Sequence, residues 1–182
     1  MAFWSTGETT PKRNFRWLVE MSDGKDISVI WWAKTVTTPS YEVSEVEHDF
    51  MDNKYYYPGR VTWNEISLTL VDPAGDPIDC VAQTLDILGA SGYDIKGADG
   101  DGVFISKYNA RDAVKGFKIS VLDESGSRIE QWELKNPFIK SAKYGDLDYS
   151  NDDLRTVELS VRYDWATCEF PNYHHLAFDP EA

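Results

Sequence analysis

A two-residue alternation of apolar and polar side chains runs through most of the chain and constrains its fold more than any other feature. The clearest stretch spans residues 157–163, where apolar side chains alternate with Glu158, Ser160 and Arg162. Successive side chains of a β-strand point to opposite faces of the sheet, so this period predicts strands. Comparable alternation recurs over residues 15–21, 27–34, 66–70, 117–121, 129–135 and 138–143. The chain is therefore expected to be mainly β.

Residues 27–34 are predicted to form one strand with an unusual property. Ile27, Val29 and Trp31 lie on one side and Ile30 and Trp32 on the other, so both faces are largely apolar. A strand of a soluble antiparallel sheet normally leaves one face to water. This strand is therefore expected to be covered on both sides.

The segment DPAGDP interrupts the strand pattern and introduces the one convincing helix, with Asp76 as the expected N-cap and Pro77 as the first helical residue. The buried stripe is predicted to comprise Ile78, Val81, Ala82, Leu85 and Leu88, and Gly89 or Gly92 is expected to end the helix. Residues 93–112 are rich in Gly and Asp and predict a loop. Seven or so strands and one flanking helix predict a β-sandwich or barrel of two packed antiparallel sheets.

The 182 residues fit a single domain with three less regular segments. Residues 1–13 are interpreted as an N-terminal arm, and residues 166–182 as a C-terminal tail. Residues 35–57 alternate weakly, are rich in carboxylates and predict an extended arm or loose hairpin. A change of strand phase near Asn64 predicts a bulge or a change of partner sheet.

The arm ends in the sequence YYYPGRVTW, which concentrates aromatic side chains where nothing in the local pattern buries them. Tyr55, Tyr56 and Tyr57 cannot all enter one core, because neighbouring strand residues point to opposite faces. The enrichment of aromatic residues at interfaces favours contact with another protein over exposure to solvent. Pro58 and Gly59 are expected to turn the chain, and Trp63 is expected to enter the subunit's own core, as are Trp17 and Tyr163.

The formal charge of −13 argues against a protein that grips nucleic acid through phosphate contacts, although strong charge also simply keeps a chain soluble. Cys80 and Cys168 have neither zinc nor disulfide spacing, which favours a reducing intracellular environment. No signal peptide or membrane span is predicted.

The sequence predicts no enzyme, metal or cofactor. His48, His174 and His175 fall in the acidic arm and the tail, where a catalytic base would lack rigid support. Asp99 and Asp101 resemble the start of a calcium loop, but the later ligand positions do not match, so a flexible polar loop is expected.

The order of elements and two motifs give the chain a family resemblance. PGRVTW leads into an alternating strand and then a helix, and YSNDDLRTVELSVRYD closes the pattern. Together they resemble the major tail tube protein of contractile-tailed, T4-type phages over about residues 14–165. The resemblance implies a β-sandwich or barrel with a flanking helix, as in the type VI secretion tube protein. It also implies hexameric rings, joined edge to edge by strands and stacked into a passive tube that a contracting sheath drives through the host envelope.

The resemblance also implies partners and places for particular residues. The partners would be further copies of the chain, the tail sheath, baseplate and terminator proteins, the tape measure protein and the genomic DNA that passes through the lumen. The virion tail, assembled in the host cytoplasm, would be its location. The residues expected at subunit interfaces are Tyr41, Val43, Tyr55, Tyr56, Tyr57, Pro58 and Gly59. The residues expected to face an acidic, DNA-repelling lumen are Ser67, Thr69, Glu158, Ser160 and Arg162, a pattern that plain solvent exposure would also give.

Three alternatives stay open on the sequence. A type VI-like carrier would form discrete rings, and a baseplate protein of the same fold would start a tube. A small carbohydrate-binding module or hydrolase would use the aromatic residues as a sugar platform and would not assemble.

Overall fold

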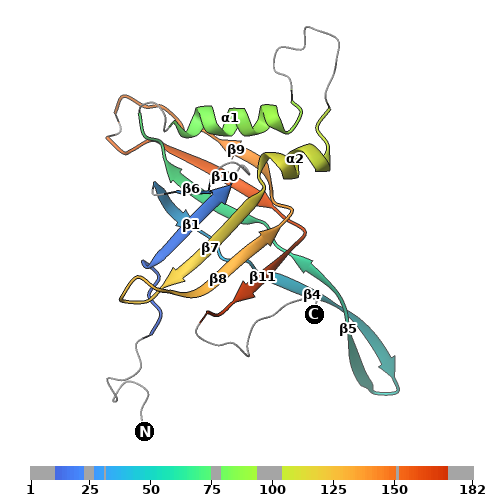
Figure 1. The fold of residues 1–182 in the computed structure, drawn as a ribbon. Coiled ribbons are helices and arrows are strands. Elements are labelled where there is room, and N and C mark those ends of the chain that lie inside the picture. Colours follow the sequence, from blue (N-terminus) through green and yellow to red (C-terminus); the bar gives the residue numbers. More distant parts are fainter. Residues whose placement is uncertain are drawn as a thin grey trace.

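The computed structural model describes residues 11–22, 27–30, 32–74, 79–93, 104–150 and 152–171. Two antiparallel sheets pack against each other, and a separate two-stranded hairpin projects from them (Figure 1). Sheet A has the strand order β11 (Trp165–Glu169), β8 (Arg128–Lys135), β7 (Gly116–Leu122), β1 (Trp17–Ser22) and β2 (Ile27–Val29). Sheet B has the order β3 (Ala33–Val36), β6 (Ile66–Val71), β10 (Thr156–Arg162) and β9 (Phe138–Lys143). The predicted sandwich is confirmed, and within the described residues the sheets remain open rather than closing into a barrel.

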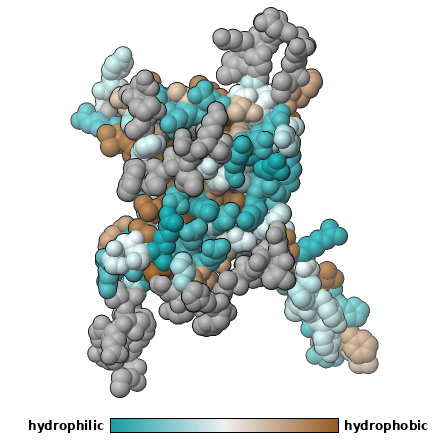
Figure 2. Space-filling model, in the orientation of Figure 1, coloured by the Kyte–Doolittle hydropathy of each residue, from teal (hydrophilic) through white to brown (hydrophobic). Residues whose placement is uncertain are grey.

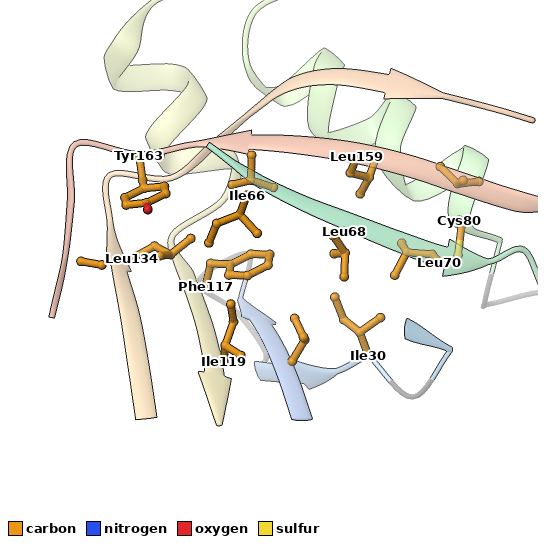
Figure 3. Packing of buried hydrophobic residues seen from close by; sticks show 14 residues of the cluster. Ile30, Ile66, Leu68, Leu70, Cys80, Phe117, Ile119, Leu134, Leu159 and Tyr163 are labelled. Atoms are coloured by element: carbon orange, nitrogen blue, oxygen red, sulfur yellow. The ribbon is translucent and has the colours of Figure 1, made fainter. Parts of the chain in front are cut away.

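The core lies between the two sheets and follows the alternation in the sequence. In β10 the side chains of Val157, Leu159 and Val161 are buried, while the residues between them are exposed or half-buried. Figure 3 shows Phe117 and Ile119 of β7 pointing toward Ile66 and Leu68 of β6 across the space between the sheets. Each such side chain contributes about 1.5–3 kcal/mol by leaving water. The sheets are therefore held by a conventional apolar core.

The prediction of a single strand over residues 27–34 is wrong, because the chain passes from sheet A to sheet B within this segment. Residues 27–29 form β2 at the edge of sheet A, and Ala33–Val36 forms β3 at the edge of sheet B. Between them the Ile30 amide donates to the Val19 carbonyl, and the Ala33 amide donates to the Ile30 carbonyl. Ile30 is buried and Trp32 packs against the core, which accounts for the apolar character of one of the two phases of this segment.

Helix α1 (Cys80–Ala90) confirms the predicted helix but begins later and faces differently. Its N-cap is Asp79, whose side chain accepts a hydrogen bond from the Ala82 amide. The prediction of Asp76 as the N-cap is therefore wrong. Asp76, Pro77 and Ile78 themselves lie outside the described residues. The buried positions are Cys80 and Thr84, whereas Ala82 and Leu85 are exposed, which corrects the predicted stripe. The Thr84 hydroxyl lies 3.2 Å from the Tyr144 hydroxyl, and Cys80 and Val81 pack with the apolar core.

The end of α1 agrees with the sequence. Ser91 is the C-cap, and Gly92 follows it with a φ of 101°, a conformation that glycine adopts without steric cost. Gly92 thus ends the helix, as predicted.

Two other predictions are corrected by secondary structure. Residues within the expected loop 93–112 form helix α2 (Lys107–Ala113), which the Ser106 side chain caps by accepting from the Asn109 amide. Only two small apolar residues of α2, Ala110 and Ala113, are buried, so the helix leaves little periodic signal in the sequence. The predicted tail 166–182 begins too early, because β11 pairs with β8 as far as Glu169. Among the described residues, no helix is both long enough and apolar enough to cross a membrane.

Candidate assembly surfaces

The hairpin of β4 (Tyr41–Phe50) and β5 (Asn53–Trp63), called the arm below, is exposed in the subunit along almost its whole length. It spans residues 41–63 rather than the predicted 35–57. The chain reverses at Met51 and Asp52, where Met51 has a φ of 55°. Pro58 and Gly59 lie inside β5, so the turn predicted at these residues is wrong.

Pro58 precedes a β-bulge and Gly59 lies in it, instead of forming a turn. Val43 pairs with Val61 and Glu45 pairs with Pro58, so β5 contains one extra residue between these pairs. The Arg60 amide donates to the Ser44 hydroxyl over 2.8 Å. A Cβ added at Gly59 would lie 2.4 Å from Ser44 Oγ and 3.0 Å from the Ser44 carbonyl oxygen. Glycine is therefore required here by the close approach of Ser44.

Beyond the bulge, the two faces of the arm differ in chemistry. Tyr55 pairs with His48 and Tyr57 pairs with Val46, so these four side chains share one face. The opposite face carries the three alternating carboxylates of β4 together with the residues that pair with them, Glu45, Glu47, Asp49, Lys54, Tyr56 and Pro58. Lys54 forms an ion pair with Glu47. The outer part of the arm is thus an amphipathic ribbon with an apolar face and an acidic face.

The base of the arm joins the core through aromatic rings. Tyr41 pairs with Trp63, and their ring centroids are 5.4 Å apart. Trp63 in turn lies 6.0 Å from the ring of Tyr163, which is buried. The predictions that Trp63 and Tyr163 enter the subunit's core are confirmed, and Trp17 also packs against it.

The three tyrosines remain exposed in the subunit. Tyr55 is 47% exposed, and Tyr56 and Tyr57 are each 57% exposed. Figure 2 shows apolar surface at the end of the projecting arm. The expectation that they cannot all enter the core is confirmed, whereas their contact with a second subunit stays a prediction. Tyr41 and Val43 at the base of the arm are exposed as well.

The residues predicted to line a lumen lie together on the polar face of sheet B, with Arg162 at the end of the same strand. Ser67 pairs with Ser160, and Thr69 pairs with Glu158. Their neighbours in sequence, including Leu68 and Leu159, point into the core, so these residues point away from it. The structure therefore gathers this set on one surface and leaves the arm as a separate one.

The polar face of sheet B is not acidic, in contrast to the predicted lumen. Lys140 donates to Glu65 over 2.8 Å, and this contact, assisted by the Ser160 hydroxyl, lowers the pKa of Glu65. Lys143 pairs with Glu158, and Arg162 lies on the same strand. Three cations and two carboxylates thus lie on this face and leave it with a net charge of +1.

The four outer strands of the sheets offer further polar edges. Within the described residues, β3 and β9 bound sheet B and β2 and β11 bound sheet A, each with a hydrogen-bonded neighbour on one side. Unpaired edges are templates for strand addition by another chain.

Helix α2 presents a surface that the sequence analysis missed. Phe104, Ile105 and Tyr108 are all more than half exposed, and the Arg111 guanidinium lies 5.1 Å from the centroid of the Tyr108 ring. The sequence contained one usable signal, the Ser106 cap ahead of a run of helix-forming residues.

The helix is tied to the sandwich by an ion pair at its first turn. Lys107 donates to both carboxylate oxygens of Asp164, at 2.9 and 2.6 Å, and the Asn136 amide donates to one of them at 2.8 Å. Burial raises the pKa of Asp164, but the hydrogen bonds from Lys107 and Asn136 outweigh it and leave that pKa below its usual value. These contacts fix the position of the α2 surface on the sandwich.

Comparison with known proteins gives a clear answer for the fold only. No family model matches the sequence, and no curated protein matches it significantly. Three solved structures align with nearly the whole chain. A chain of the anti-feeding prophage baseplate has a TM-score of 0.67 and 15% identity, over 89% of this chain and 97% of that one. A chain of the sheath/tube terminator of an extracellular contractile injection system, PVC, has a TM-score of 0.65 and 17% identity, over 89% of this chain and 99% of that one. A chain of the tube-terminating cap of the anti-feeding prophage has a TM-score of 0.63 and 16% identity, over 93% of this chain and 99% of that one.

The chain has a tail-tube-like fold. Its resemblance to tube proteins, first seen in the order of its elements, is confirmed at the level of the fold. All three neighbours come from structural assemblies, namely a baseplate, a terminator and a cap, and not from enzymes.

Proposed function

We propose that this chain is a structural subunit that assembles with copies of itself into stacked rings, forming the tube of a contractile particle. The observation that carries the proposal is the combination of a tail-tube-like fold with an arm whose aromatic residues are exposed in the subunit. A fold alone does not define a function, because one fold supports many. The exposed arm adds a surface suited to contact between subunits.

Within this proposal each surface has a role. The arm, including Tyr41, Val43, Tyr55, Tyr56 and Tyr57, contacts the neighbouring ring. The outer strands of sheet B join neighbouring subunits edge to edge, which places its polar face toward the channel. Ser67, Thr69, Glu158, Ser160 and Arg162 then line the lumen. Their hydroxyls and balanced charges give a surface without a strong preference for either sign of charge.

The finer proposal is a contractile phage tail tube with hexameric rings through which genomic DNA is ejected. Its partners are the sheath, the baseplate, the terminator and the tape measure protein, and its place is the virion. The sequence resemblance supports the phage assignment. The likeness to sheath/tube terminator and cap structures supports partners at the sheath and at the end of the tube.

A second candidate is a tube-initiating protein, favoured by the likeness to a baseplate chain. Such a protein forms a single ring or a short stack, whereas the main tube subunit grows without a fixed length. Tube length after growth from purified protein distinguishes the two.

Negative-stain microscopy of the purified, concentrated protein tests the proposal. We expect stacked rings or tubes. A protein that stays monomeric at every concentration and binds glycans would contradict the proposal and favour a carbohydrate-binding module.

A further inference from the structure

The arm and the α2 surface lie at different ends of the molecule and have complementary chemistry. In Figure 1 the helices lie along the top of the sandwich, while the arm projects at the lower right. A contact between two different surfaces at different ends is heterologous, so it repeats from copy to copy and builds an open stack when the repeat does not close on itself. The two surfaces therefore have the geometry of a donor and an acceptor in one repeating contact.

Their charges are opposite. Residues 45–58 of the arm contain four carboxylates and one lysine, a net charge of −3. Residues 104–115 around α2 contain three cations, Lys107, Arg111 and Lys115, and one carboxylate, a net charge of +2. Lys107 is paired with Asp164, so with that carboxylate included the α2 surface keeps a net charge of +1 on a chain whose total charge is −13. Complementary charge steers two surfaces together and excludes wrong partners.

Both surfaces also carry exposed apolar side chains. On the arm, Val46 and Phe50 are more than half exposed near Tyr55 and Tyr57. Beside α2, Phe104 is 83% exposed and Tyr108 is 64% exposed. The apolar face of the ribbon supplies contact, while the acidic face lies on the other side of a two-stranded layer. At physiological ionic strength, a charge across such a layer stays within roughly one Debye length, about 8 Å, of the docked surface.

We infer that the arm of one copy docks on the α2 surface of the next copy, with its apolar face against Phe104, Ile105 and Tyr108. The basic residues Arg111 and Lys115 then attract the carboxylates of the arm. This inference rests on the proposed function, because it names the acceptor surface for the contact between rings. The partner is a second copy of this chain.

A charge exchange tests the inference with variants that leave the core untouched. Variant one carries Glu45→Lys and Asp49→Lys in the arm, and variant two carries Arg111→Glu and Lys115→Glu at the α2 surface. We expect each variant alone to lose most of its sedimentable polymer at about 0.15 M salt, since like charges then meet. We expect sedimentable polymer to return in the chain that carries all four substitutions. We expect the same in an equimolar mixture of variants one and two, because opposite charges meet again in both cases. A matched control with Glu124→Lys and Asp146→Lys, which lie on exposed loops, is expected to polymerise normally.

Cysteine cross-linking supplies a second readout that does not require tubes. The chain's own Cys80 and Cys168 are buried, so introduced cysteines report the contact. Tyr55→Cys combined with Tyr108→Cys is expected to give a ladder of disulfide-linked oligomers on non-reducing gels. Tyr55→Cys combined with Tyr149→Cys, at an exposed position outside both surfaces, is expected to give no ladder.

The outcomes separate the inference from the proposed function. If the unmodified protein forms tubes but the charge exchange does not restore polymer and the ladder is absent, the inference is overturned and the tube function stands. If the unmodified protein never assembles and no ladder forms at high concentration, both are overturned. Recovery of polymer together with the ladder supports both.

Discussion

The arm and the β7–β8 hairpin are both long antiparallel pairs, but they relate to the rest of the subunit in opposite ways. The β7–β8 hairpin buries Phe117, Ile119 and Leu134 against sheet B. In the arm, every residue of β4 is exposed, and β5 is exposed as far as Thr62. An isolated two-stranded hairpin is marginally stable in water. The difference shows that the outer aromatic residues of the arm, Tyr55, Tyr56 and Tyr57, do not hold the fold together and are available for a contact outside it.

The largest effect is expected from Phe117→Ala, which removes a side chain that is only 1% exposed between the sheets. Removal of a buried aromatic ring costs about 3–5 kcal/mol, because contacts are lost and a cavity remains. Urea denaturation of the monomer measures the free energy of unfolding. A loss below about 1 kcal/mol would show that β7 contributes no more to stability than the arm does.

A smaller effect is expected from Asp164→Asn, which removes the ion pair that holds α2. At neutral pH we expect a loss of about 0.5–1.5 kcal/mol, because the Lys107 ammonium loses a charged acceptor. The folded-state pKa of Asp164 is lowered, so its contribution is present above the unfolded pKa of about 3.9 and disappears as the pH falls through the folded value. Denaturation at pH 7 and at a pH below the folded pKa should show the variant approaching the unmodified protein in acid. An equal difference at both pH values would exclude the ion pair as the cause.

The bulge of the arm provides a test with little expected effect on the core. In Gly59→Val, the new Cβ meets the Ser44 hydroxyl and carbonyl, so Ser44 must shift and the bulge of the arm is distorted. We expect the free energy of unfolding to change by no more than about 0.5 kcal/mol, while polymer formation falls sharply. Gly89→Ala is the matched control, because a Cβ at that helical position has no atom within 4 Å. Normal polymerisation of Gly59→Val would show that the geometry of the arm is unimportant.

The parts of the fold that follow from local alternation were predictable from the sequence. β6 and β10 alternate cleanly because one face of each meets the core, and the sequence pattern also marked β7, β8 and β9 as strands. The sheet change between residues 27 and 36 was not predictable, because Ile30 and Trp32 face the core from a turn. The orientation of α1 was missed because the helix buries Cys80 and Thr84 rather than a stripe of large apolar side chains.

The candidate surfaces show the same division. The pairing of Ser67 with Ser160 follows from strand phase, so the shared face of the polar residues was accessible from the sequence. The role of Gly59 in the bulge could not be predicted from the sequence, because a glycine after proline signals a turn more often than a bulge. The α2 surface depends on a short helix and on the Lys107–Asp164 contact, whose partners are far apart in the sequence.

The most direct test of the account replaces Tyr55, Tyr56 and Tyr57 together by Ser. The same protein preparation is examined by urea denaturation of the monomer and by sedimentation and negative-stain microscopy of the concentrated protein. Because these side chains are exposed in the subunit, we predict a global unfolding free energy within about 0.5 kcal/mol of the unmodified value, together with loss of rings and tubes. Normal tube growth by the folded triple variant would contradict the assignment of the arm as the assembly surface.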